Sequence, residues 1–368
     1  MNNRTVIPIA MASDNKYMPY TYVAIYSLLK NKAPDTVYNI YLLHSVNLKK
    51  KFIKNLDNLV KKYNCLIKFI DMGNSYKNQK SRLSHISYTT FYRLLLPEIL
   101  DKISYCIWLD GDVIVQKDLT LLYNIDMGDN YIAGVRDAYE VINPNYFKEL
   151  GIKDLSYYIN AGVCVWNLEQ MRKDNLAYKF SELIKNNYQF MDQDIINVAC
   201  YGKIKLLSLE NNAMSNFFDK ASGKLEPMYD NFLCAKERLL KKDDLIVIHY
   251  CTYIKPWNKK FFLGKIWWEY TKKTPYYAKL KNKFKKINGK LSRLEKVFSV
   301  KNVGVYKKIS ILGVSFKIKS NSLIEREKLN QIINNQRREI DLLYQILDGQ
   351  RKLSIESQND SKGLHLVA

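Results

Sequence analysis

The sequence predicts an α/β protein with a mostly parallel sheet flanked by helices, followed by a basic C-terminal helical appendage. Two observations predict this class. Short apolar runs alternate with longer helix-like stretches through residues 1–258, an order typical of parallel sheets with covered faces. The net charge of +22, from 58 basic and 36 acidic residues, is concentrated beyond residue 258. The length of 368 residues suits one large α/β domain with an appendage.

The elements of the first part follow from these runs and from the residues that interrupt them. Short apolar runs predict strands at 6–10, 38–44, 66–71, 105–109 and 244–248. Longer stretches between them predict helices at 20–31, 48–64 and 89–100. Ligands of such sheets bind outside the carboxyl ends of the strands. We therefore expect the functional site just after these apolar runs.

The C-terminal part differs in charge from the rest. Residues 259–319 hold 18 Lys or Arg against two acidic residues, a net charge of +16, which predicts a boundary at 258. We expect 1–258 to be the catalytic domain and 259–320 to be a basic, aromatic segment that associates with an anionic membrane surface. Residues 321–368 would form an amphipathic helix and tail. Apolar spacing over 329–347 fits either a short coiled coil or a helix packed on the body.

Composition also limits the class of protein. The N-terminus lacks a signal-peptide core, and no apolar run approaches the roughly 18 residues of a membrane span. The six cysteines form no C-x-x-C pair and lie in apolar or strand-like runs, which predicts buried free thiols in a cytoplasmic protein. The charge favours anionic partners. Nucleic acid is disfavoured as a partner, because the charge lies outside the globular part and no known binding pattern is present.

The strongest local signal is a pair of carboxylates after a buried strand. Asp110 and Asp112 follow the run at 105–109 and are separated by one residue. Since side chains alternate along a strand, both can point to the same side at the sheet edge. Two hard oxygen donors suit Mg²⁺ or Mn²⁺ and a diphosphate. Alternatively, the pair is ordinary turn chemistry at the end of a strand.

A second signal follows the strand at 244–248. His249 lies at the exit of that strand, and Lys255 precedes Pro256, which favours an extended backbone there. Lys255 could reach a phosphate as a point charge. The alternatives are a structural, hydrogen-bonding histidine and an ordinary surface lysine.

Two further clusters carry polar side chains. Asp192, Gln193 and Asp194 lie in what resembles the first turn of a helix, where an aspartate is most often a capping residue. Asn160 and the small pair after it precede a buried strand, and a turn is the default interpretation there.

Taken together, the pieces form a pattern. The chain resembles family 8 retaining glycosyltransferases of the GT-A fold, especially bacterial lipopolysaccharide galactosyl- and glucosyltransferases. Six motifs within the first 258 residues carry this resemblance, in the family's order: Ala12-Ser13-Asp14-Asn15-Lys16-Tyr17, His85-Ile86-Ser87-Tyr88-Thr89-Thr90-Phe91-Tyr92-Arg93, Asp110-Gly111-Asp112, Asn160-Ala161-Gly162, Asp192-Gln193-Asp194 and His249 through Trp257.

The resemblance implies a UDP-sugar donor at the end of the first strand and a divalent ion, normally Mn²⁺, between donor and protein. Asp110, Asp112 and His249 would be the metal ligands. The residues implied to bind the donor are Ala12, Asp14, Tyr17, Arg93, Asp137, Asn160 and Lys255. Among these, Asp14 would accept the uracil N–H, Tyr17 would stack on the ring, and Lys255 would stabilise the UDP leaving group.

The resemblance also frames the catalytic question. Retention by double displacement needs a carboxylate nucleophile, but the matched position is Gln193, whose amide oxygen is a poor one. A front-face route is therefore favoured, with Gln193 stabilising positive charge, Asp192 binding sugar hydroxyls and Lys255 assisting departure. A nucleophilic Asp192 or Asp194 is the minority alternative.

The expected function is transfer of galactose or glucose from UDP to a lipid-linked surface saccharide, such as lipopolysaccharide, by an enzyme that is peripheral on the inner face of the cytoplasmic membrane. The alternatives are a UDP-N-acetylhexosamine transferase and a non-catalytic nucleotide-sugar-binding protein. Two departures from the family pattern affect the expected contacts. Thr252 replaces a common glycine near the phosphates, and the neighbour of Asp137, Arg136, is basic where an apolar residue is common.

Overall fold

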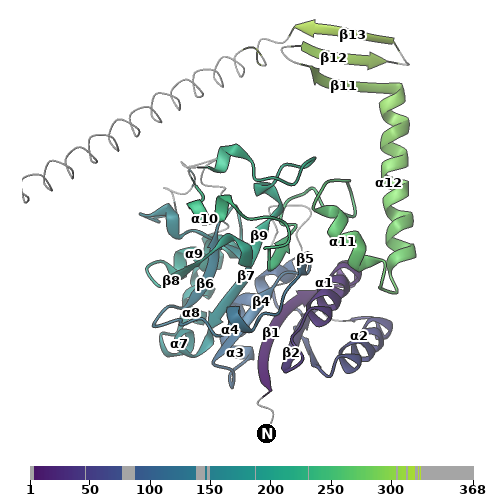
Figure 1. Cartoon of the computed structure of the whole chain (residues 1–368). Coiled ribbons are helices and arrows are strands. Elements are labelled where there is room, and N and C mark those ends of the chain that lie inside the picture. Colours follow the sequence, from purple (N-terminus) through teal and green to yellow (C-terminus); the bar gives the residue numbers. More distant parts are fainter. Residues whose placement is uncertain are drawn as a thin grey trace, which may run out of the picture. The chain divides into compact units, whose positions relative to one another are not determined.

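The computed structural model describes residues 4–45, 47–76, 88–137, 146, 150–186, 188–230, 232–303, 306–311, 314–319, 322 and 324 (Figure 1). The chain divides into two units, Met1–Phe284 and Lys285–Ala368. Two features of the sequence lie outside the described residues: positions 85–87 of the second motif and the apolar repeat over 329–347.

A mostly parallel sheet forms the centre of the first unit, as the sequence predicts. Within the described residues it has seven strands in the order β3-β2-β1-β4-β7-β6-β8. The strands are β1 (Thr5–Ser13), β2 (Thr36–His44), β3 (Leu66–Asp71), β4 (Tyr105–Leu109), β6 (Ile132–Arg136), β7 (Ile159–Asn167) and β8 (Ile204–Leu207). Strand β7 is antiparallel to both β4 and β6, and the other pairs are parallel.

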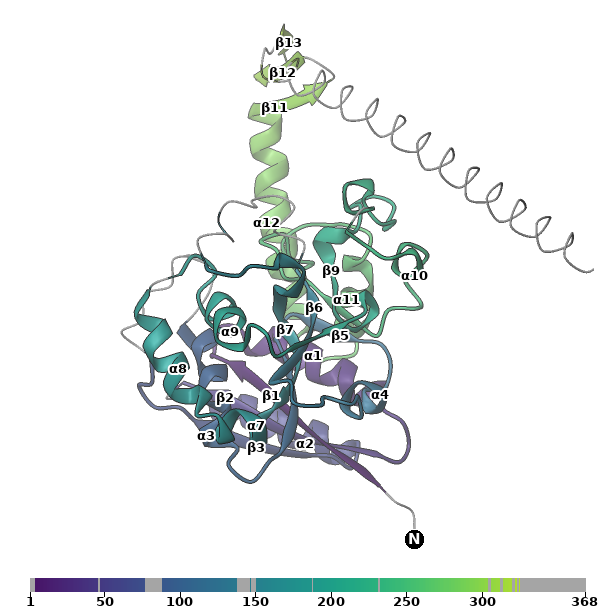
Figure 2. The same cartoon turned by 90° about the vertical axis from the view of Figure 1, so that its left-hand side faces the viewer.

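Alternation along the strands divides the core into two layers. In β4, Ile107 and Leu109 face one layer, whereas Cys106 and Trp108 face the other. The first layer includes the buried faces of α1 (Met18–Lys30) and α2 (Lys50–Lys62). The second is covered by α3 (Leu96–Ile99), α7 (Leu168–Lys173), α8 (Leu176–Leu183) and α9 (Asp192–Cys200), with α8 beside α9 (Figure 2). Both faces of the sheet are therefore buried, as a parallel sheet requires.

A second, smaller sheet adjoins the carboxyl end of β4. Its order is β5-β10-β9, with β5 (Val113–Val115), β9 (Ala213–Met214) and β10 (Val247–His249). Two short helices also belong to the first unit, α4 (Thr120–Tyr123) and α10 (Ala235–Arg238). The strand predicted at 244–248 is shorter than expected and ends on His249 itself.

Two local predictions need correction. Residues 89–100 form a 3-10 helix, Tyr88–Leu95, that continues into α3. Pro97 lies in the first turn of α3 and lacks an N–H, so the α-helix cannot extend backward through it. Asn160, Ala161 and Gly162 do not form a turn but lie inside β7, between Ile159, which pairs with Arg136 of β6, and Val163, which pairs with Leu109 of β4.

The first unit extends past residue 258, to Phe284, because the segment that follows completes the core. The start of α12 (Tyr277–Val297) is basic, whereas α11 (Gly264–Thr271) has one lysine and one glutamate, and two aromatic side chains of this segment pack inward. Trp267 is fully buried and Tyr276 is 6% exposed. Tyr276 packs against Tyr22 of α1 and Phe52 of α2. Trp267 and Tyr276 thus stabilise the first unit and are not free to enter a membrane.

The appendage is only partly helical. After α12, strands β11 (Phe298–Val303), β12 (Tyr306–Ile311) and β13 (Val314–Lys319) form an antiparallel sheet. Among the described residues, no helix is long and apolar enough to cross a membrane. All six cysteines are free; four are buried as predicted, but Cys234 is exposed and Cys251 is half-buried.

Candidate active site

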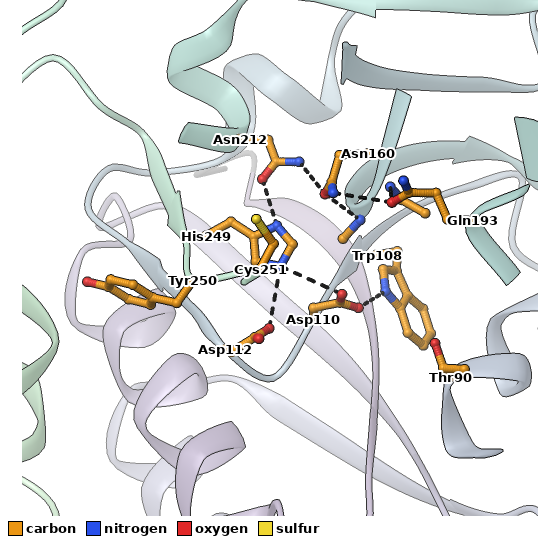
Figure 3. A network of polar contacts seen from close by, with 12 residues as sticks. Thr90, Trp108, Asp110, Asp112, Asn160, Gln193, Asn212, His249, Tyr250 and Cys251 are labelled. Carbon is orange, nitrogen blue, oxygen red and sulfur yellow. Dashed lines mark hydrogen bonds and ion pairs between the residues drawn. The ribbon is translucent and has the colours of Figure 1, made fainter. Parts of the chain in front are cut away.

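The two sheets bring three predicted ligands together at the carboxyl end of β4. Asp110 follows β4, Asp112 precedes β5, and His249 pairs with Val113 of β5 through β10. The Nε2 atom of His249 lies 3.8 Å from Oδ2 of Asp110 and 3.5 Å from Oδ1 of Asp112 (Figure 3). One ligand atom from each residue lies within 4.8 Å of the others. Residues that are 137 positions apart in the chain thus share one site.

Lys255 contacts the other carboxylate oxygen of Asp112. Its Nζ donates to Oδ2 of Asp112 and to the carbonyl oxygen of Tyr250. Burial alone would favour the neutral acid, but the Lys255 ammonium and His249 outweigh it and hold the pKa of Asp112 below its ordinary value. Asp112 is therefore a carboxylate at neutral pH, with Oδ1 facing His249.

Asp110 is oriented by two donors. Arg93 Nη2 donates to Oδ1 at 2.8 Å and the indole N–H of Trp108 donates to the same oxygen at 2.7 Å. The guanidinium carbon of Arg93 also lies 4.5 Å from the centre of the Trp108 ring. These contacts leave Oδ2 of Asp110 facing His249.

Arg93 joins this cluster to the start of α9. Its Nε lies 2.9 Å from Oδ2 of Asp192, and Thr90 donates to Oδ1 of Asp192 at 2.7 Å. Burial raises the pKa of Asp192 to about 6, against the opposing charge of Arg93. The N-cap residue of α9 is Met191, and its side chain makes no capping hydrogen bond. The carboxylate of Asp192 contacts Arg93 and Thr90. The capping alternative is therefore wrong for Asp192.

The amide of Gln193 is held at both ends. Its Oε1 accepts from the backbone N–H of Ala161 at 3.1 Å and from Asn160 Nδ2 at 3.2 Å. Its Nε2 donates to Asp137 Oδ2 at 3.1 Å and to the hydroxyl of Tyr158 at 3.2 Å. Asn160 donates to the same oxygen of Asp137 at 3.0 Å. The predicted residues Asp137, Asn160 and Gln193 thus form one network.

Asp194 is joined to this network through Tyr158 and is completely buried. Tyr158 donates to its Oδ1 at 2.6 Å, while Tyr146 at 2.5 Å and the backbone N–H of Phe190 at 2.7 Å donate to its Oδ2. Burial raises the pKa of Asp194. Both of its oxygens are engaged in holding the start of α9.

The end of β1 reaches the same edge of the sheet. Asp14 accepts from the backbone N–H groups of Lys16 and Tyr17 at 2.8 and 2.7 Å, which fixes the turn into α1. Burial, together with Asp112, raises the pKa of Tyr17 well above its ordinary value, so its hydroxyl stays protonated. Ala12 packs with the second layer of the core. Tyr17 therefore lies against Asp112, and Asp14 holds the turn that places it there.

The family of the chain follows from its similarity to known proteins. Residues 8–260 match the sequence profile described as Glycosyl transferase family 8. The chain belongs to glycosyl transferase family 8. The match covers all six motifs identified above and ends just after the segment that carries Lys255.

Individual family 8 relatives extend the comparison. A candidate glycosyltransferase of Haemophilus influenzae is 30% identical over 304 residues, which cover 76% of this chain and 87% of that protein. A lipopolysaccharide 1,2-glucosyltransferase of Escherichia coli is 25% identical, over 70% and 75% of the two chains. The galactosyltransferase LgtC, solved with donor and acceptor sugar analogues, has a TM-score of 0.63 and 26% identity, over 73% and 96% of the chains.

Family 8 membership implies a divalent metal and a nucleotide sugar, and the residues present fit the metal. Two carboxylates and one imidazole form a donor set of oxygen and nitrogen that suits Mn²⁺ or Mg²⁺. The carboxylate oxygens that face His249 are not the ones taken by Arg93, Trp108 or Lys255. Asp110, Asp112 and His249 would hold the ion.

Sequence reasoning missed Asn212, which contacts His249 and Asn160. It follows another asparagine before a short strand, a pattern indistinguishable from a turn. The roles of Trp108 and Thr90 were also missed, although both are in or beside the motifs. The two residues that depart from the family pattern each make local contacts. Thr252 makes hydrogen bonds with the backbone of Ile254, and the guanidinium of Arg136 lies 4.1 Å from the centre of the Phe232 ring.

Proposed function

We propose that this family 8 chain is a retaining hexosyltransferase that moves galactose or glucose from a UDP-sugar to a lipopolysaccharide-type acceptor, with Mn²⁺ as its metal. The observation that carries the proposal is the cluster of Asp110, Asp112 and His249, with cationic side chains on both sides. A bound cation there would neutralise part of the diphosphate charge.

Charge around the cluster supports binding of a nucleoside diphosphate. Lys255 and Arg93 place positive charge next to Asp112 and Asp110. When a diphosphate leaves its sugar, negative charge develops on the leaving oxygen, and a nearby ammonium stabilises it. Asp14 and Tyr17, at the end of β1, are the proposed contacts of the uracil.

Retention is best explained by front-face displacement. The carboxylate of Asp192 is engaged by Arg93 and Thr90, and that of Asp194 by two tyrosines and a backbone N–H. Neither is free to attack an anomeric carbon. In the front-face step, the bond from anomeric carbon to phosphate oxygen breaks, the acceptor oxygen bonds on the same face, and its proton passes to the departing phosphate.

In this reaction Gln193 acts through its amide. Backbone and side-chain partners fix the amide in one orientation. A preorganised dipole stabilises developing charge without the cost of reorienting in the transition state. We propose that Asp192 and Asn160 bind the sugar hydroxyls. Asp137 would contact the sugar on the side that faces the acceptor saccharide.

The acceptor class is proposed from the relatives and from the charge of the C-terminal segment. One relative is a lipopolysaccharide 1,2-glucosyltransferase. Exposed lysines of α12, including Lys279 and Lys281, would attract anionic lipid, each contributing roughly 1 kcal/mol near the surface. Trp267 and Tyr276 of this segment pack inward, so the proposed peripheral membrane association rests mainly on charge.

A donor panel tests the proposal. UDP release should be measured with UDP-glucose, UDP-galactose and their N-acetyl forms, with Mn²⁺ and with a chelator. Turnover of a hexose donor that depends on the metal is expected. Preference for an N-acetylhexosamine donor would replace the proposed sugar, and binding without turnover of any donor would indicate a non-catalytic protein.

A further inference from the structure

Asn212 is a buried amide whose role none of the motifs explains. It ends the 3-10 helix Leu209–Asn212, directly before β9, and its exposed fraction is 0%. Its Nδ2 donates to Oδ1 of Asn160 at 3.0 Å, and its Oδ1 lies 3.1 Å from Nδ1 of His249. Figure 3 shows it between these two residues, so that it joins the metal ligand to the network around Gln193.

The direction of these hydrogen bonds follows from a backbone group. The N–H of Gly162 can only donate, and it lies 3.1 Å from Oδ1 of Asn160. That atom must therefore be the amide oxygen of Asn160. Because an oxygen only accepts, the atom of Asn212 that faces it must be the NH₂ group. The oxygen of Asn212 then faces His249.

The hydrogen bonds at the other end of this network agree with the assignment. With its oxygen toward Gly162, Asn160 turns its NH₂ group to the carboxylate of Asp137, which only accepts. Gln193 turns its oxygen to the backbone N–H of Ala161 and its NH₂ group to Asp137. Asn160 and Gln193 are thus each fixed by a partner that cannot exchange roles, and the orientation of Asn212 follows from that of Asn160.

The consequence falls on His249. An amide oxygen at Nδ1 requires a proton on Nδ1, which leaves the lone pair of the neutral imidazole on Nε2. Nε2 is the atom that faces Asp110 and Asp112. Histidine ligands are commonly oriented in this way, by a hydrogen bond from the ring nitrogen that does not bind the metal.

We propose that Asn212 is a positioning residue for the metal site: it selects the His249 tautomer that presents Nε2 to the ion and ties the ring to the amide network of the sugar site. The inference rests on the proposed metal-dependent function and deepens it. Asn212 contacts neither the sugar donor nor the acceptor saccharide and acts only through His249 and Asn160.

Manganese binding to the full-length protein, measured by electron paramagnetic resonance as loss of the free Mn²⁺ signal, tests the proposal without using activity. Asn212→Leu should weaken Mn²⁺ binding about 10- to 100-fold. Asn212→Asp keeps an acceptor for the Nδ1 proton and should restore affinity to within a few-fold of wild type. Asn167→Leu is the matched control: it removes another buried amide, which caps α7 away from the site, and should leave Mn²⁺ binding unchanged.

A tautomer measurement separates this inference from the proposed function. In ¹⁵N-histidine-labelled protein with Mg²⁺, the four histidines give few signals, and the signal lost in His249→Gln identifies His249. Wild type should show the proton on Nδ1 of the neutral His249 ring. A proton on Nε2, or unchanged Mn²⁺ affinity in folded Asn212→Leu, would overturn the inference. If wild type bound no Mn²⁺ but showed the Nδ1 proton, the proposed function would fail while the tautomer assignment held.

Discussion

Gly162 lies next to two of the proposed metal ligands, and adding one methyl group there should damage the site selectively. A Cβ atom at this position would lie 2.1 Å from Cε1 of His249, 2.8 Å from its Nδ1 and 2.9 Å from Oδ2 of Asp110. Gly162 is part of β7 with extended backbone, so alanine causes no strain in the main chain. His249 and Asp110 must therefore move.

The size of the effect can be worked from this contact. Adding a methyl group to a tightly packed site costs about 1–3 kcal/mol in strain. If His249 relieves that strain by leaving the position that it needs in the metal complex, the same energy is lost from metal affinity. This corresponds to about 5- to 150-fold weaker Mn²⁺ binding.

Calorimetric titration of Mn²⁺ into Gly162→Ala in the presence of UDP measures this loss, and urea unfolding measures stability. Gly134→Ala is the matched control. Its Cβ would meet the side chains of Ile159 and Cys164 in the same sheet, with the nearest contact at 2.6 Å, but no proposed ligand. Both variants should be destabilised, and only Gly162→Ala should lose Mn²⁺ affinity. Wild-type affinity in folded Gly162→Ala would refute the geometry.

Three further predictions concern catalysis, pH and the membrane. Gln193→Ala should turn over about 10²- to 10³-fold more slowly, and NMR should still show an α-linked product. Detection of a glycosyl adduct on Asp192 or Asp194 by mass spectrometry would contradict the front-face route. Because the pKa of Asp192 is raised to about 6, its carboxylate becomes protonated as pH falls through that value. The kcat/KM of wild type should therefore decline below pH about 6, and Asp192→Asn should lack this acidic limb; an unchanged limb would assign it to another group. Full-length protein should float with anionic vesicles at low salt, and replacing Lys279, Lys285 and Lys286 with Gln should weaken that binding by about 3 kcal/mol, or about 150-fold. Equal flotation with neutral vesicles would exclude an electrostatic role.

The parts of the fold that follow from local pattern were predictable from the sequence. The strands at 66–71 and 105–109 match the structure residue for residue, because each is a short run rich in apolar residues that ends at or just before a polar one. The place of Asn160 inside a strand was not predictable in this way, since the residues on both sides of it pair with strands that are distant in the sequence. Likewise, the burial of Trp267 comes from packing against α1, which a charge count cannot detect.

The same distinction holds for the site. The spacing of Asp110 and Asp112 indicates a metal site in the sequence, and the position of His249 after an apolar run indicates a third ligand. Asn212 gives no such signal, because its role arises only when β9 and β10 pair and bring it beside His249. The network of Asn160 and Gln193 similarly joins β7 to α9 across 33 positions of the chain.

The central claim is that Asp110, Asp112 and His249 hold the ion on which glycosyl transfer depends, and Asp112→Asn tests it most directly. The substitution keeps the shape of the side chain but removes its charge. Turnover of the preferred UDP-sugar should be measured for wild type and variant in Mn²⁺ and in EDTA, with circular dichroism as the check on folding. The account predicts activity of wild type in Mn²⁺, its loss in EDTA, and a decrease by orders of magnitude in the folded variant. Full activity of Asp112→Asn in EDTA would contradict it.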